Sequence, residues 1–216
     1  MDINYEELFA DFKKKVSTDE KLSASDITKK ITDYFAKRFS SQAVLCSGKA
    51  IKKSEYLTDV LVTNFEPKNI ARKEHGRFMV PEKEISALLA VESELGGEGG
   101  TSAGPVLKNV IEDFIKLLLL KCKYKVMIFS SVQLKDENEY LTNRVKTLLE
   151  VKNNTDSSNE EILLIHLLGS MHKSNSGNPR LFNDNYFFLS TTIRITDPLK
   201  RFFSWFSGPF SVFLLN

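Results

Sequence analysis

The feature that most constrains the fold of this sequence is an apolar run that ends in two carboxylates, Leu88-Leu89-Ala90-Val91-Glu92-Ser93-Glu94. An apolar run of this length is typical of a buried strand. Glu92 and Glu94 are two residues apart, so on a strand they point to the same face. Two like charges on one face of a core strand are unfavourable unless something compensates them. A bound divalent cation is the compensation that has catalytic consequences.

A second acidic pair, Glu55 and Asp59, lies upstream beside another apolar run. Asp59 begins an expected strand over residues 59–63, so it meets Glu92 if the two strands pair. Glu55 is four residues earlier and can reach the same side. A competing interpretation stays open, in which Glu92 and Glu94 end a strand in solvent, Asp59 lies in a turn and Glu55 is an exposed helix acid.

The rest of the sequence predicts alternating helices and strands. Helices are expected over residues 4–16, 25–40, 106–121 and 137–151. Strands are expected over residues 43–46, 59–63, 85–94, 124–131, 162–168 and 186–195, with loops over 66–83 and 169–185. Strand–helix–strand crossovers imply a sheet with helices on its faces. We therefore expect an α/β fold with an N-terminal helical extension (1–42) and a core (43–216), together forming one compact unit.

Composition limits the class of protein further. Apolar residues make up 42% of the chain and charged residues 27%, which excludes wholesale disorder. The net charge of +2 does not by itself indicate a nucleic-acid binder, although lysines cluster locally. Two cysteines without metal-site spacing favour a reducing compartment, so we expect a cytoplasmic protein. No secretory signal or membrane-spanning apolar stretch is expected.

Several other sites are disfavoured by the sequence. The glycine-rich segment 96–105 lacks the GK[ST] ending of a nucleotide-binding P-loop. His166 lies in the apolar run Leu163–Leu168, which favours a core histidine with a hydrogen-bond partner. No histidine pairs with a cysteine at zinc-site spacing, and no Ser-His-Asp signature is present.

The pattern Asp59 … Glu92-Ser93-Glu94, followed by a helix and an apolar strand, resembles the PD-(D/E)XK phosphodiesterase core of type II restriction endonucleases. The resemblance covers about residues 50–131 and implies a mixed sheet flanked by helices in αβββαβ order. The family pattern has lysine where this sequence has Glu94, and some restriction endonucleases carry Glu there. Another departure moves the lysine onto the following helix, where Lys116 is the candidate and Lys108 the weaker one.

The resemblance implies a Mg²⁺-dependent DNA endonuclease with a role in restriction or defence, for which Mn²⁺ can serve as a surrogate. Asp59 and Glu92 would ligate the metal, and Glu94 would help ligate it or position the attacking water. Glu55 would be an auxiliary acid, and Lys116 would stabilise the phosphate charge. A homodimer is also open, because two sites cut two strands most easily. The alternative is a nuclease-fold module that has lost catalysis and binds DNA or protein.

Overall fold

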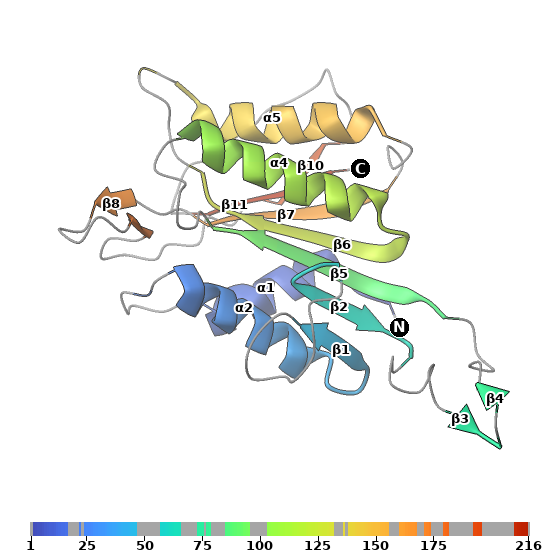
Figure 1. The fold of residues 1–216 in the computed structure, drawn as a ribbon. Coiled ribbons are helices and arrows are strands. Elements are labelled where there is room, and N and C mark those ends of the chain that lie inside the picture. The colour runs from blue at the N-terminus through green and yellow to red at the C-terminus, as the bar shows by residue number, and fades with distance from the viewer. Residues whose placement is uncertain are drawn as a thin grey trace.

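The computed structural model of this chain describes residues 2–16, 22, 24–46, 57–65, 73–75, 77–78, 85–95, 103–131, 136, 138–155, 160–167, 171–173, 179–181, 192–195 and 210–215. Over these residues the fold is α/β, with a mixed sheet between two pairs of helices (Figure 1). The α/β prediction is therefore confirmed at this level. The candidate acid Glu55 lies outside the described residues.

The central sheet contains, in spatial order, β1 (Ala43–Cys46), β2 (Val60–Thr63), β5 (Ala87–Glu94), β6 (Cys122–Phe129), β7 (Ile162–Leu167), β11 (Phe210–Leu215) and β10 (Thr192–Ile195). Strands β1, β2 and β5 are antiparallel neighbours, whereas β5, β6 and β7 are parallel. Strand β11 is antiparallel to β7 and parallel to β10. The carboxyl ends of β5, β6 and β7 therefore meet at one edge, where β2 begins.

Helices α1 (Tyr5–Val16) and α2 (Ala24–Arg38) cover one face of the sheet (Figure 1). The helical spacing of apolar residues in α1 predicts this packing, since Leu8, Phe9 and Phe12 are all buried against the sheet. Phe12 forms an edge-to-face contact with Tyr34 of α2, with ring centroids 5.2 Å apart. This face is thus closed by a largely aromatic layer.

Helices α4 (Ala103–Leu119) and α5 (Tyr140–Asn153) cover the other face. Buried Phe114 and Leu117 of α4 belong to an apolar cluster with Met127 and Phe129 of β6. Helix α4 connects β5 to β6, which are parallel, so it is the crossover helix that this connection requires. The crossover places α4 against the strand that carries Glu92 and Glu94.

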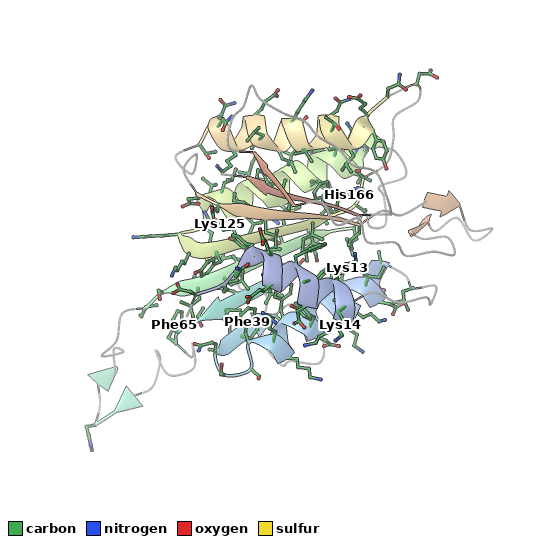
Figure 2. All side chains as sticks on the ribbon, turned by 180° about the vertical axis from the view of Figure 1, so that it is seen from behind. Lys13, Lys14, Phe39, Phe65, Lys125 and His166 are labelled. Atoms are coloured by element: carbon green, nitrogen blue, oxygen red, sulfur yellow. The ribbon has the colours of Figure 1, made fainter. Side chains whose placement is uncertain are left out.

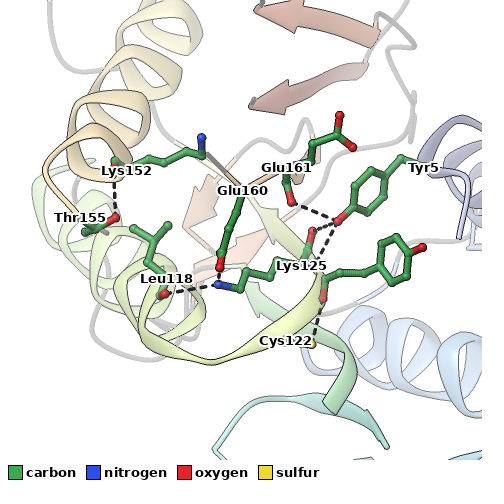
Figure 3. A network of polar contacts seen from close by, with 9 residues as sticks. Tyr5, Leu118, Cys122, Lys125, Lys152, Thr155, Glu160 and Glu161 are labelled. Atoms are coloured by element: carbon green, nitrogen blue, oxygen red, sulfur yellow. Dashed lines mark hydrogen bonds and ion pairs between the residues drawn. The ribbon is translucent and has the colours of Figure 1, made fainter. Parts of the chain in front are cut away.

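A polar network lies near the starts of β6 and β7 (Figure 3). The buried Lys125 ammonium donates to the carbonyl of Leu118 in the last turn of α4 and forms an ion pair with Glu160. The Lys125 backbone N–H donates to the Tyr5 hydroxyl at 2.9 Å, and that hydroxyl lies 3.2 Å from the Glu161 carbonyl. This network fastens α1 and α4 to the same end of the parallel strands.

The predicted elements are confirmed with boundaries that differ by no more than three residues for all four helices and for the strands near 43–46, 59–63, 85–94, 124–131 and 162–168. For the expected strand 186–195, the structure describes β10, and residues 186–191 lie outside the described part. The loop predictions were wrong where β3 (Lys73–Glu74), β4 (Arg77–Phe78), β8 (Met171–Lys173) and β9 (Pro179–Leu181) form. Ladders of two or three residues are too short for periodicity to reveal.

Candidate active site

Asp59 and Glu92 meet because β2 pairs with β5 in the register Val60↔Val91. The Asp59 backbone N–H donates to Glu92 Oε2 at 3.3 Å. Asp59 Oδ2 in turn accepts hydrogen bonds from the Ser93 N–H at 2.8 Å and from the Ser93 hydroxyl at 2.5 Å. The predicted meeting of the two acids is therefore observed, and Ser93 fixes the Asp59 carboxylate in place.

Glu92 is buried, with only 3% of the residue exposed, so the interpretation that it reaches solvent is wrong. Its Oε1 atom has no hydrogen-bond partner among the residues that the structure describes. Burial is the main reason that its pKa rises from 4.5 to about 8, and the nearby charges of Asp59 and Asp113 raise it further. The folded state therefore favours the protonated, neutral form of this side chain.

Helix α4 contributes an ion pair to this site. Asp113 and Lys116 are three residues apart, on one side of the helix, and their charged atoms lie 2.5 Å apart. The charge of Asp113 raises the pKa of Glu92 and that of Lys116 lowers it, so both side chains act on the buried carboxylate. Sequence reasoning proposed Lys116 but missed Asp113, whose position depends on how α4 packs against β5.

The remaining candidates, Glu94 and Lys108, differ in burial and in their partners. Glu94 is the last residue of β5, is partly buried and pairs in register with Phe129. Lys108 forms a 3.5 Å ion pair with Glu112 at the surface, and its side chain is 75% exposed. Lys116 is therefore the better of the two candidate lysines on α4. Of the predicted residues, the structure brings Asp59 and Glu92 into contact and places Lys116 near enough for its charge to lower the pKa of Glu92.

The arrangement offers carboxylate oxygens, which are hard ligands, and a lysine whose side chain is 54% exposed. Within the described ranges, no group of three or more His, Cys, Asp or Glu side chains is placed to hold a metal ion by itself. Mg²⁺ sites commonly use one or two carboxylates and complete the octahedron with water and substrate phosphate. The unpartnered Glu92 Oε1 beside Asp59 fits that smaller requirement.

His166 forms a second polar centre, on β7. Its Nε2 atom lies 2.8 Å from Ser131 Oγ, and its ring makes an edge-to-face contact with Phe129. This confirms the prediction of a core histidine with a hydrogen-bond partner. Burial lowers the pKa of His166 from 6.5 to about 3, so the ring is neutral near pH 7. Its Nδ1 atom has no hydrogen-bond partner in the part of the chain described.

No protein-family model, curated protein or solved structure matches this sequence. Among the described helices, none combines the length and the apolar character needed to cross a bilayer.

Proposed function

We propose that this protein is a Mg²⁺-dependent phosphodiesterase that cleaves DNA, with a PD-(D/E)XK-like core. The observation that carries the proposal is the buried Glu92 carboxylate, which has one oxygen without a hydrogen-bond partner among the described residues and accepts a hydrogen bond from the Asp59 N–H. An ionised carboxylate in this site is costly for the fold, because burial and the nearby acids outweigh the charge of Lys116, and a divalent cation would supply the missing charge.

The order of elements supports the same proposal. Apart from the small β3–β4 pair, the chain runs α2, β1, β2, β5, α4, β6, which is the αβββαβ order that the resemblance implies. Asp59 directly precedes the second strand of that order, and Glu92 lies on the third. This order supports the proposal that the two acids serve as the metal ligands that the resemblance implies.

In the proposed site, Mg²⁺ would neutralise phosphate charge and activate a water molecule. Asp59 is already oriented by Ser93, so little side-chain freedom would be lost on binding. Glu94 lies one pleat repeat beyond Glu92, about 7 Å along the strand, where a carboxylate can position the attacking water. Lys116, whose side chain is 54% exposed and whose charge acts on Glu92, would stabilise charge on the phosphate.

A second candidate function is a catalytically inactive module of the same fold that binds DNA or protein. The observation that favours it is Glu94 at the position where the resembled family has lysine, together with Lys116 already paired to Asp113. Roles in restriction or defence, and a homodimer with two sites, belong to the first proposal and rest on the resemblance.

The test is calorimetric titration with Mn²⁺, followed by cleavage of supercoiled plasmid DNA with Mg²⁺. We expect wild type to bind Mn²⁺ and cut DNA, and Glu92→Gln to lose both while remaining folded. Glu112→Gln is the matched control, because Glu112 is an exposed acid on α4 that pairs with Lys108. Wild type that binds no Mn²⁺ and leaves DNA intact would favour the inactive module. Cleavage that survives Glu92→Gln would overturn the site.

A further inference from the structure

The Ser131–His166 pair lies at the same edge of the sheet as the proposed site. In the parallel register, Glu94 pairs with Phe129, and Phe129 pairs with His166, so these residues form one row across β5, β6 and β7. The row is continued by backbone, because the Ser130 N–H donates to the Glu94 carbonyl at 3.0 Å. Figure 2 shows His166 at the opposite end of the parallel strands from Lys125. Ligands of open sheets containing parallel strands characteristically bind at this carboxyl-end edge.

Both members of the pair are nearly inaccessible, but they differ in what they can reach. His166 is completely buried, whereas Ser131 keeps 7% of its surface exposed, two residues beyond the end of β6. A neutral serine and a neutral histidine have two donor hydrogens between them, and their mutual hydrogen bond uses only one. When His166 Nε2–H donates to Ser131, the serine hydroxyl hydrogen is available to a ligand.

The pair is not explained by stability. An apolar pair at these positions would fill the same space, whereas His166 Nδ1 has no hydrogen-bond partner among the described residues, and a buried unsatisfied polar atom generally destabilises the folded state. Packing alone, therefore, does not account for a serine and a histidine here. A histidine that orients the Ser131 hydroxyl toward a ligand gives the pair a role that packing does not.

The chemistry of the edge selects the ligand. The acids Asp59, Glu92 and Glu94 at this edge are assigned to the proposed metal and its water, so a cationic side chain at the Ser131 position would compete with the metal for their oxygens. A neutral hydroxyl donor attracts a phosphate oxygen without neutralising the acids. Ser131 is one strand over from Glu94 and two residues further along, roughly 8 Å away by strand geometry. Neighbouring phosphates of one DNA strand are farther apart through space than the axial rise of about 3.4 Å, because the backbone winds round the axis. The two positions therefore correspond to about one nucleotide step.

We propose that Ser131 binds a backbone phosphate of the DNA substrate about one nucleotide from the scissile bond, with its hydroxyl oriented by His166. Ser131 is a substrate-binding residue in this scheme, and His166 is a positioning residue that acts through it. The inference rests on the proposed function, because it takes the strand to pass over Glu92 and Glu94.

The test compares Ser131→Ala and His166→Phe with Ser130→Ala, the matched control in the neighbouring serine. The readouts are KM and kcat for plasmid cleavage, the Kd for a labelled 30-base-pair duplex in EDTA, and Tm. We expect Ser131→Ala to raise KM and Kd about tenfold, with kcat within twofold, because a hydrogen bond to a charged oxygen is lost. His166→Phe should raise KM and Kd similarly while keeping or increasing Tm, and Ser130→Ala should change neither constant.

Normal KM and Kd in a folded Ser131→Ala variant would overturn the inference and leave the proposed function intact. If Ser131→Ala does not fold, His166→Phe decides the same question, and unchanged constants there overturn it. Wild type that neither binds the duplex nor cuts the plasmid would refute the proposed function, and this inference with it. The two failures are distinguishable, because the second appears in wild type before any substitution is made.

Discussion

The two faces of the central sheet differ in what they bury. Under α1 and α2 the core is apolar and aromatic, and the hydroxyls of Tyr5 and Tyr34 both reach hydrogen-bond partners. In the described part of the chain, five acidic or basic side chains are buried on the face that α4 and α5 cover or on α5 itself: Glu92, Lys125, Arg144, Lys152 and His166. Burying ionisable groups in a core is energetically costly. Their concentration on one face therefore indicates that this face has a role beyond stabilising the fold.

The second face is itself divided between its two edges. Near the starts of the parallel strands, buried Lys125 has both a carboxylate and a helix carbonyl as partners. At the carboxyl ends, Glu92 and His166 each retain an atom without a hydrogen-bond partner among the described residues. Unsatisfied buried groups are costly and tend to persist where a ligand or a reaction uses them. The α1/α2 face therefore stabilises the fold. The Lys125 edge attaches the helices to the sheet, and the edge with Glu92 and His166 is available for binding or catalysis.

The largest expected effect on stability is at the aromatic face. Phe12 is completely buried between Tyr34 and Phe35, so Phe12→Ala should lower the free energy of unfolding by about 3–5 kcal/mol. Leu119→Ala is the control, since Leu119 is 77% exposed and its loss should change stability by less than about 0.5 kcal/mol. Urea unfolding measures both. A loss below about 1 kcal/mol for Phe12→Ala would contradict the assignment of this face to stability.

The pH dependence of stability should reveal the cost of ionising Glu92 at the carboxyl-end edge. The folded pKa of Glu92 is about 8 and its ordinary value is 4.5, so the folded state binds this proton more tightly than the unfolded state does. The stability that this bound proton contributes is fully present below pH 4.5 and is lost as the pH rises through 8. Glu92→Gln removes this loss, so it should exceed wild type by on the order of 3 kcal/mol at pH 8.5 in EDTA and match it near pH 4.

His166 provides the opposite dependence on the same face. Its folded pKa of about 3 lies below the ordinary 6.5, so its contribution is present above pH 6.5 and is lost as the pH falls through 3. His166→Phe should therefore gain relative to wild type in acid, where Glu92→Gln gains nothing. Urea unfolding from pH 4 to 8.5 checks both variants against Glu112→Gln. If the free energy of unfolding depends on pH in the same way for Glu92→Gln and wild type, the pKa of Glu92 is not raised in the folded state.

A smaller effect, on activity, is expected at α4. Lys116→Met keeps the aliphatic stem but removes the charge that acts on Glu92, so kcat for DNA cleavage should fall about 100-fold. Lys108→Met is the matched control from the same helix and should leave kcat within twofold, because Lys108 pairs with Glu112 at the surface. Equal rates for Lys116→Met and wild type would remove the lysine from the proposed site and restrict the chemistry to the strands.

Sequence reasoning reached the fold class and the meeting of Asp59 with Glu92, because strand periodicity and chain order suffice for both. It also reached the buried state of His166, which lies within an apolar run. It missed Asp113, because a helix acid becomes part of a site only through the packing of α4 on β5. It missed the pairing of Lys125 with Glu160 for a similar reason, since the partners are 35 residues apart and neither belongs to a repeating pattern.

The smallest expected effect separates the Lys125 edge from an ordinary surface ion pair. Glu160→Gln leaves the Lys125 ammonium buried with only the Leu118 carbonyl as its remaining described partner, which is unfavourable. Glu160 is 43% exposed, so solvent reduces the loss, and we expect about 1–2 kcal/mol from urea unfolding at pH 7. Lys15→Met breaks the exposed pair with Asp11 and should change stability by less than about 0.5 kcal/mol. Equal effects in the two variants would mean that burial of Lys125 adds nothing, and the distinction between the two edges would then rest on Glu92 and His166 alone.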